Sequence, residues 1–219
     1  PAPGHLTRFY LMVSLGGALG GMFVGVAAPV LFSWHWELPI ALAVLAGTLI
    51  FLASGRLRPA AAAVFCVSLL GAAEYVAFVR HDTLEVARNF YGALRVKASG
   101  DPASPHARRV LLHGAITHGD QYLSPARARE PTSYYGETSG IARTIVALRE
   151  RDRALRIGVI GLGTGTLAAH GRPGDAMRIY ELDPHVLDVA RRHFTYLRDS
   201  AAAISTPLGD ARLVLEREA

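Results

Sequence analysis

Three glycines at alternate positions are the residues of this sequence best suited to hold a small ligand. Gly161, Gly163 and Gly165 directly follow a short segment, 155–160, that is rich in β-branched residues and reads as a strand. Glycines permit backbone angles that other residues avoid and let a ligand approach the main chain. A helix expected after the loop would add unpaired amides and the positive end of its dipole. The pattern predicts a strand, a glycine loop and a helix around a ligand.

Acidic residues follow the loop at a useful distance. Glu181 stands twenty residues after Gly161, and together with Asp183 it closes the next predicted strand, 177–182. A carboxylate at this position can accept hydrogen bonds from both hydroxyls of a ribose. Asp210 follows a third predicted strand, 204–208, and therefore belongs to the same carboxyl edge of the sheet. On the residues alone, Asp210 is equally suited to cap a helix over 211–218.

The glycine spacing also selects the kind of nucleoside. A dinucleotide-binding loop would carry its third glycine one residue later than Gly165. The closer spacing fits a site of the adenosylmethionine type, and it disfavours a cofactor that contains a pyrophosphate. We therefore expect Gly161, Gly163, Thr164, Gly165, Glu181, Asp183 and Asp210 to bind the nucleoside part of such a ligand.

The elements that must position these residues can be read from hydrophobic periodicity. Helical spacing of Ile141, Ile145 and Leu148 predicts a helix over 137–149. Alternation predicts two strands, 89–96 and 109–116, that form a small β-hairpin, and Pro184 opens a helix to about residue 194. We divide the chain into an apolar part, 1–80, a linker, hairpin and helix, 81–150, and a partial nucleoside-binding domain, 151–219.

The apolar front part predicts an integral membrane protein. Three runs with few charges, 9–32, 38–53 and 60–79, have the composition of transmembrane helices. Five glycines between positions 16 and 25 of the first run leave a face with little bulk, which favours close helix packing. We expect a lipid bilayer as partner, and self-association into a homo-oligomer is compatible with such a face.

Composition argues against several other classes of protein. The formal net charge of +5 is spread without a basic block, so we expect no nucleic-acid partner. The single cysteine, Cys66, excludes internal disulfides. His113 and His118 were the best metal candidates, but strand alternation predicts that they lie on opposite faces, and no third ligand has suitable spacing. We therefore expect no metal.

The sequence motifs of the second half of the chain resemble those of a known family, the spermidine synthases or aminopropyltransferases. The similarity spans about 89–219, and the apolar part is similar to the membrane region of multi-pass, spermidine-synthase-like bacterial proteins. The motifs that carry it are 91–92, 112–116, 135–137, 159–166, 180–184 and 209–211. The resemblance implies an α-helical transmembrane segment followed by an α/β Rossmann-type, adenosylmethionine-dependent methyltransferase-like domain with a small N-terminal β-hairpin. It also implies that Glu181 holds the ribose, that Asp210 holds the adenine amino group, and that Tyr135 and Glu137 face an amine acceptor.

Two departures from the family pattern bear on the reaction. The family loop usually carries an aspartate, which binds the cationic amine of the aminopropyl donor, where this chain has Thr164. The segment between Gly114 and Tyr135 is also longer than usual, so we expect a remodelled acceptor pocket there. The family's catalytic aspartate would lie beyond Ala219. We expect the chain to be a truncated fragment that lacks half of the sheet and is itself inactive.

Three functions follow as hypotheses. The leading one is aminopropyl transfer from decarboxylated S-adenosylmethionine to a small-molecule amine in a membrane-bound enzyme of polyamine biosynthesis. The alternatives are another S-adenosylmethionine-dependent transfer, such as methylation, and a non-catalytic domain that senses a nucleoside or polyamine and regulates the helices. We expect the bacterial inner membrane as location. The basic residues Arg8, Arg56 and Arg58 predict that the Rossmann-type domain is outside, whereas a cytosolic donor requires it in the cytoplasm. We favour the cytoplasm, because we expect a truncated N-terminus that hides other helices and a glycine-rich first run that is re-entrant or bent.

Overall fold

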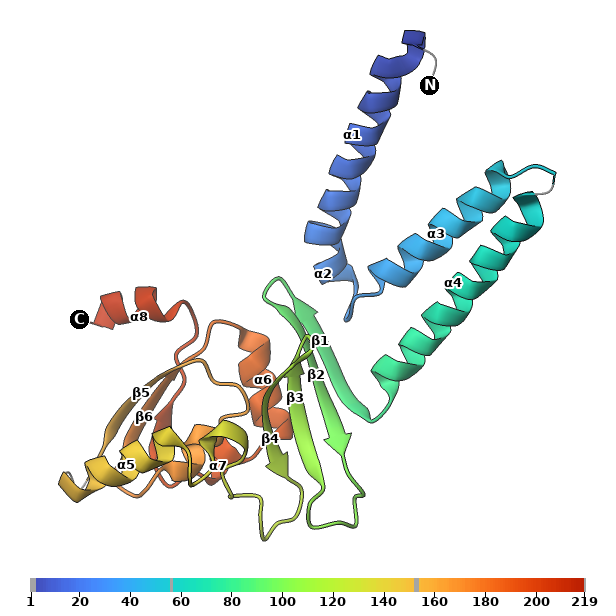
Figure 1. Cartoon of the computed structure of the whole chain (residues 1–219). Helices are drawn as coiled ribbons and strands as arrows, with labels where there is room; N and C mark the ends of the chain where they lie inside the picture. Colours follow the sequence, from blue (N-terminus) through green and yellow to red (C-terminus); the bar gives the residue numbers. More distant parts are fainter. Residues whose placement is uncertain (1–2, 56, 152–153, 219) are drawn as a thin grey trace. The chain divides into compact units, whose positions relative to one another are not determined.

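The computed structural model describes residues 3–55, 57–151 and 154–218 of the chain. The chain forms two compact units, one made of residues 1–81 and 88–93 and the other of residues 82–87 and 94–219. Figure 1 shows the apolar helices in blue and cyan, and the strands and shorter helices in green to red. The sequence predicts this organisation, in which N-terminal apolar helices are followed by an α/β part with antiparallel and parallel sheets.

The first apolar run is one continuous helical segment. It begins with a short 3-10 turn, η1 (Pro3–His5), and continues through α1 (Leu6–Met22), a π-helical turn, η2 (Phe23–Ala27), and α2 (Ala28–Leu31). Pro29 has no amide hydrogen, and the helix widens just before it, where the Ala28 amide donates to the Phe23 carbonyl. The run has 26 residues, or about 39 Å at 1.5 Å per residue. This length is enough to cross a hydrocarbon core of about 30 Å.

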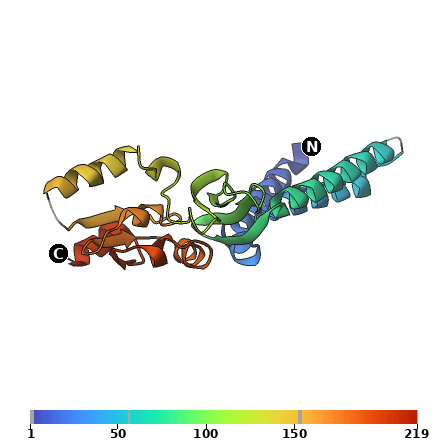
Figure 2. The same ribbon diagram turned by 90° about the horizontal axis from the view of Figure 1, so that it is seen from below.

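The next two helices form an antiparallel pair. Figures 1 and 2 show α3 (Glu37–Leu52) and α4 (Leu57–Arg80) side by side. Of the described helices, the first run and α4 are long and apolar enough to cross a membrane, while α3 has 16 residues, or about 24 Å, and is shorter than a hydrocarbon core of about 30 Å. Helix α4 begins three residues before the predicted boundary, because Pro59 is tolerated in a first turn.

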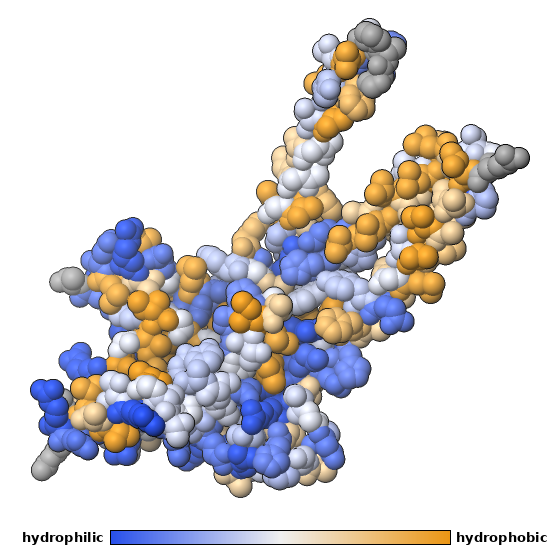
Figure 3. All heavy atoms as spheres, in the orientation of Figure 1, coloured by the Kyte–Doolittle hydropathy of each residue, from blue (hydrophilic) through white to orange (hydrophobic). Residues whose placement is uncertain are grey.

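The surfaces of these helices are apolar. Figure 3 shows hydrophobic residues along α3 and α4, and large side chains such as Phe51 and Leu70 are exposed by 86% and 68%. The glycine face of the first run is open, because a Cβ built at any of the four glycines of α1 or at Gly25 of η2 meets no described atom within 4 Å. Exposed apolar helices of this kind are suited to lipid or to further helices.

A four-stranded antiparallel sheet follows, in the order β1 (Thr83–Asn89), β2 (Gly92–Ser99), β3 (Arg108–His113) and β4 (Ile116–Tyr122). The predicted hairpin is confirmed in its pairing, since β2 and β3 are antiparallel with Leu94 opposite His113. Its boundaries were wrong. The predicted first strand contains the turn at residues 90–91, and the predicted second strand contains the turn at Gly114, which has a φ of +60°.

The parallel sheet has three strands in the order β5 (Arg156–Ile160), β6 (Ala176–Tyr180) and β7 (Ala203–Ser205). Helix α6 (Pro184–His193) agrees with the predicted helix and buries Val186, Leu187 and Val189 against Ile179. The same core contains Leu94, Val96 and Leu111, so the antiparallel sheet packs on this helix. Helix α7 (Tyr196–Asp199) follows, and α8 (Ala211–Glu218) comes after β7.

One buried carboxylate joins the start of β5 to the preceding helix. The Asp175 carboxylate accepts hydrogen bonds from the Leu155 and Arg172 amides, at 2.9 and 2.8 Å. It also forms an ion pair with Arg149 of α5 (Gly140–Arg151), at 2.7 Å. Burial alone would raise the pKa of Asp175, but the two amides and the Arg149 guanidinium lower it overall. Helix α5 begins three residues after the predicted boundary, since Ser139 accepts the Ala142 amide and caps it.

Candidate functional site

A pocket of about 400 Å³ lies at the carboxyl ends of the parallel strands. Ile160 at the end of β5 lines it together with Gly161, Tyr180 at the end of β6 lines it together with residues 181–182, and residues 209–212 line it from the turn before α8 and the first two residues of that helix. Gly161, Glu181 and Asp210, which the sequence predicted as nucleoside ligands, therefore line one cavity. The carboxyl edge of a parallel sheet is where α/β proteins bind ligands.

Glu181 links the glycine loop to the chain after β6. One of its carboxylate oxygens accepts the Leu162 amide at 2.8 Å, and the other accepts the Asp183 amide at 2.9 Å. The residue is buried, with 8% of its surface exposed. Each carboxylate oxygen has two lone pairs, so each can accept one more hydrogen bond, as the hydroxyls of a ribose would require.

Asp210 both lines the pocket and caps a helix. Its carboxylate accepts the Leu213 amide at 3.1 Å, and its carbonyl accepts the Val214 amide at 2.9 Å. This geometry is that of an N-cap residue. The side chain is exposed, so the two interpretations left open by the sequence are compatible in one conformation.

Asp183 has a capping role of its own. The Asp183 side chain accepts the His185 amide at 2.9 Å at the start of α6, and the residue is 4% exposed. It does not belong to the described lining of the pocket beside Glu181. In this structure the residue fixes the direction in which α6 leaves the sheet.

The three glycines of the loop have different tasks. All adopt positive φ values, +90° at Gly161, +57° at Gly163 and +80° at Gly165. A Cβ at Gly163 would lie 2.6 Å from the His118 carbonyl oxygen, and one at Gly165 would lie 3.2 Å from Leu197. At Gly161 a Cβ would meet nothing within 4 Å. Only Gly161 faces the pocket, whereas the other two allow β4 and α7 to approach the loop.

The expected helix after the loop is absent from this position. Residues Thr166–His170 form a short 3-10 turn, η4. Gly171, Pro173 and Gly174 follow within four residues, and glycine and proline disfavour helix interiors. The prediction of an α-helix here is wrong, and with it the contribution that a helix dipole would make to anion binding.

Thr164 packs inside the protein. It is 1% exposed, its hydroxyl lies 2.7 Å from that of Thr166, and a Cβ at Gly119 would come within 2.3 Å of its Oγ1. The side chain therefore contacts β4. In this arrangement Thr164 offers a ligand neither a charge nor an exposed hydroxyl.

His113 and His118 lie together beside the loop. Their ring centroids are 5.4 Å apart, because the turn at Gly114 places the two residues on neighbouring strands. The prediction that they lie on opposite faces is wrong, since it treated them as part of one strand. Burial is the main cause that lowers the pKa of His118, and the neighbouring His113 lowers it further, while the Glu181 carboxylate opposes that shift. Among the described residues, no group of three or more metal-ligating side chains occurs.

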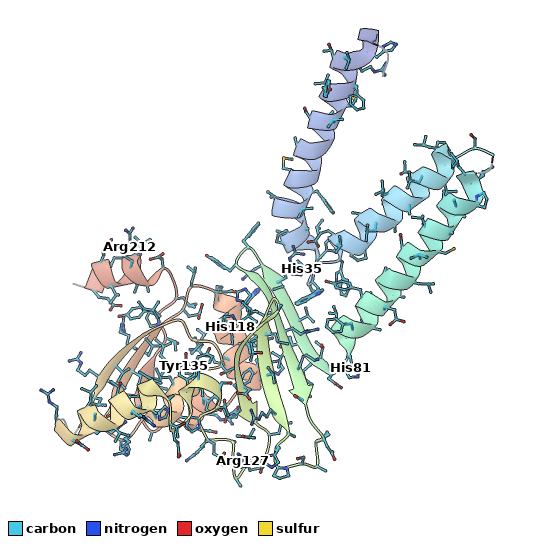
Figure 4. The ribbon with its side chains drawn as sticks, in the orientation of Figure 1. His35, His81, His118, Arg127, Tyr135 and Arg212 are labelled. Atoms are coloured by element: carbon cyan, nitrogen blue, oxygen red, sulfur yellow. The ribbon has the colours of Figure 1, made fainter. Side chains whose placement is uncertain are left out.

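The residues expected to face an amine acceptor lie outside the described lining of this pocket. Tyr135 belongs to η3 (Ser133–Tyr135) and packs on a core formed by Ile145, Leu155 and Leu167. Its carbonyl lies 2.7 Å from His170 Nε2, and Glu137 is exposed in the turn before α5. Figure 4 shows Tyr135 near α5, away from Arg212 on α8. Neither Tyr135 nor Glu137 is among the described residues that line the pocket.

The polar segment before Tyr135 is held together internally. Asp120 forms an ion pair with Arg108 at 2.7 Å and accepts the Ser133 hydroxyl at 2.9 Å. The Tyr196 hydroxyl donates to the Asp120 and Glu130 carbonyls, and burial raises its pKa to about 12. These contacts give the segment a structural role.

Leu182 and Arg212 also line the pocket, although the sequence did not single them out. Each lies near a predicted acid, since Leu182 follows Glu181 and Arg212 stands two residues after Asp210.

No protein-family model, curated protein or solved structure matches the chain. Its fold is that of an α/β part with apolar N-terminal helices, and it has a pocket at the carboxyl edge of the parallel sheet.

Proposed function

We propose that this protein is a membrane-bound transferase of the spermidine-synthase-like kind, whose α/β part is Rossmann-type and binds an adenosylmethionine-type nucleoside. The observation that carries the proposal is the cavity in which Gly161, Glu181 and Asp210 meet. The Glu181 carboxylate can accept further hydrogen bonds from ribose hydroxyls, and the exposed Asp210 carboxylate can accept a hydrogen bond from the amino group of adenine. The open backbone at Gly161 leaves room for the nucleoside between them.

The reaction we propose is aminopropyl transfer from decarboxylated S-adenosylmethionine to an amine. The amine lone pair attacks the methylene carbon next to the sulfonium, the carbon–sulfur bond breaks with its electrons going to sulfur, and the amine loses one proton. The products are a longer polyamine and methylthioadenosine. Holding the two reactants in line would supply much of the rate, and a base would accept the proton.

Methyl transfer from S-adenosylmethionine is the second candidate, and Thr164 favours it. The buried Thr164 brings no negative charge to the loop, whereas the aminopropyl donor is expected to need one for its cationic amine. The products separate the two candidates, since aminopropyl transfer releases methylthioadenosine and methyl transfer releases S-adenosylhomocysteine.

For the location, we propose the inner membrane with the α/β part in the cytoplasm, where adenosylmethionine compounds are made. Basic residues flank the apolar helices on both sides in the sequence, with Arg8, Arg56 and Arg58 on one side, and with Arg80 at the end of α4 and Arg88 on β1 on the other. Because the positive-inside rule counts lysines and arginines near each helix end, these charges give no strong preference for either orientation.

The nucleoside site can be tested with Asp210→Ser in the full chain. Serine keeps the N-cap but withdraws the carboxylate from the pocket. Hydrogen bonds to charged groups contribute about 1.5–3 kcal/mol, so methylthioadenosine should bind about tenfold to a hundredfold more weakly. Isothermal titration calorimetry of the purified protein in nanodiscs measures the change.

The matched control is Asp188→Ser, at an exposed aspartate on α6 outside the described pocket lining. It should leave nucleoside affinity unchanged. Equal affinity of the Asp210→Ser and unchanged proteins would contradict the assigned site. Turnover assays with both donors and several amines then test the reaction in a protein that includes the expected catalytic aspartate, where tight nucleoside binding without release of either product would favour the sensing alternative.

A further inference from the structure

The tip of the β1–β2 hairpin belongs to the helical unit. Residues 88–93, which contain the turn between the strands, cluster with the apolar helices, whereas the adjoining residues 82–87 and 94–99 cluster with the α/β unit. The chain reverses at Phe90 and Tyr91, where the Asn89 side chain accepts the Tyr91 amide at 2.8 Å. The tip is therefore part of the same compact unit as the helices.

A buried ion pair fastens this tip to the connection between α2 and α3. The two terminal nitrogens of Arg88 donate to the two carboxylate oxygens of Glu37 at 2.8 and 2.9 Å, and one of them also donates to the Trp34 carbonyl at 2.9 Å. The two side chains are only 7% and 10% exposed. Paired, bidentate geometry of this kind fixes orientation as well as position.

Aromatic residues with polar edges gather at the same end of the helices. The Trp34 indole donates to the Tyr75 hydroxyl at 2.8 Å, and the Trp36 ring meets the Tyr75 ring edge to face at 6.0 Å. Tryptophan and tyrosine concentrate where a membrane meets water, because one part of each side chain is apolar and another forms hydrogen bonds. This cluster marks the level of that interface on the helices.

Two further aromatic side chains extend from the tip. Phe90 is 66% exposed and Tyr91 is 51% exposed. Arg88 is occupied by Glu37, so the attachment of the tip leaves no unpaired charge from this pair. An exposed, aromatic and locally neutral tip, held beside an interfacial tryptophan cluster, is suited to the boundary between headgroups and acyl chains.

We infer that Phe90 and Tyr91 form an interfacial anchor that contacts the lipid bilayer next to the helices. The inference rests on the membrane placement proposed above, and it does not depend on the transferase reaction. The partner is the interface of the bilayer itself. Anchoring by aromatic rings requires no anionic lipid, so it should occur in phosphatidylcholine alone.

Site-directed spin labelling can test the anchor in the full chain, because Cys66 is the single cysteine. In a Cys66→Ala background, Phe90→Cys and Tyr91→Cys are labelled separately, so that each variant keeps one tip aromatic. The proteins are placed in phosphatidylcholine nanodiscs. Electron paramagnetic resonance then compares collisions of each label with oxygen, which enters the bilayer, and with a water-soluble nickel chelate.

Two labelled sites calibrate the result. The native Cys66, exposed on α4, is the lipid reference, and Ala103→Cys in the exposed β2–β3 turn is the aqueous reference. Labels at positions 90 and 91 should show an oxygen-to-nickel ratio at least several-fold above that at position 103 and approaching that at Cys66. A ratio equal to that at position 103 at both tip sites would overturn the anchor.

Two other outcomes would also overturn it. Protection of both tip labels from oxygen and nickel alike would mean that protein covers the tip. An aqueous signal at Cys66 would remove the membrane placement, and the anchor with it. The experiment involves no nucleoside, so a failed transferase assay leaves the inference intact, and a failed anchor leaves the nucleoside site intact.

Discussion

Each oxygen of the Glu181 carboxylate accepts one backbone amide, and the same residue lines the pocket. A side chain that is held in place from two directions loses little further freedom when a ligand binds. Asp210 is likewise held by its helix cap. At the scale of single residues, the contacts that stabilise the fold also orient the groups expected to bind the nucleoside.

His118 gives a prediction at the same scale. Because burial and His113 lower its pKa and Glu181 raises it, histidine proton resonances should show His118 titrating below its usual value of about 6.5. Glu181→Gln should lower the pKa of His118 further, and His113→Gln should raise it. A His118 pKa unchanged in both variants would contradict the arrangement of these three residues.

The sign of the linked stability change follows from this shift. The unfolded chain takes up a proton at His118 at a higher pH than the folded protein does. The contribution of His118 to stability is therefore fully present above about pH 6.5 and is lost as the pH falls toward the lower folded pKa. In His118→Gln, that part of the acid sensitivity between those pH values should disappear from thermal unfolding curves.

The glycine loop is an element in which backbone angle and packing can be separated by a matched series. Gly158 has no strained angle and no neighbour within 4 Å, Gly161 has only the strained angle, and Gly163 has both the angle and the His118 carbonyl. Gly158→Ala should be neutral or slightly stabilising in a strand. Gly161→Ala should cost about 1–3 kcal/mol of unfolding free energy, and Gly163→Ala should cost more.

Unfolding of the detergent-solubilised variants, followed by circular dichroism, tests this order. A Gly163→Ala protein as stable as Gly161→Ala would contradict the close approach of β4 to the loop, because those two positions share the strained angle and differ in that contact. The series also concerns function, because the loss of nucleoside affinity in Gly161→Ala should exceed that in Gly158→Ala. Of the three glycines, only Gly161 lines the pocket.

At the scale of the whole molecule, α4 is the last apolar helix before the α/β part, and its 24 residues are enough to cross a bilayer. The two ends of α4 should then face different compartments. In a Cys66→Ala background, Ser54→Cys lies in the turn before α4, and Ala103→Cys lies beyond it. A membrane-impermeant maleimide should label Ser54→Cys in intact cells and Ala103→Cys only in inverted vesicles.

The reverse labelling pattern would place the α/β part outside and count against both transferase reactions. Labelling of both cysteines from the same side would contradict a crossing by α4. Because neither position lies in the described pocket lining, this test of location is independent of ligand binding.

The sequence alone was sufficient for features that depend on local patterns. Long apolar runs predict helices because their length and composition suffice, and Gly161, Glu181 and Asp210 could be assigned to one sheet edge because parallel strands end together. The helix after Asp183 was also predictable, since Pro184 and an N-cap acid are local signals.

Other features required the tertiary structure, because they depend on contacts between residues far apart in the sequence. The contacts of Gly163 and Thr164 with β4, and those of Tyr135 with its core partners, could not be read from the sequence. The pairing of His113 with His118 depends on a turn at Gly114. The ion pair of Arg88 with Glu37 spans 51 residues, and no local periodicity carries information over that distance.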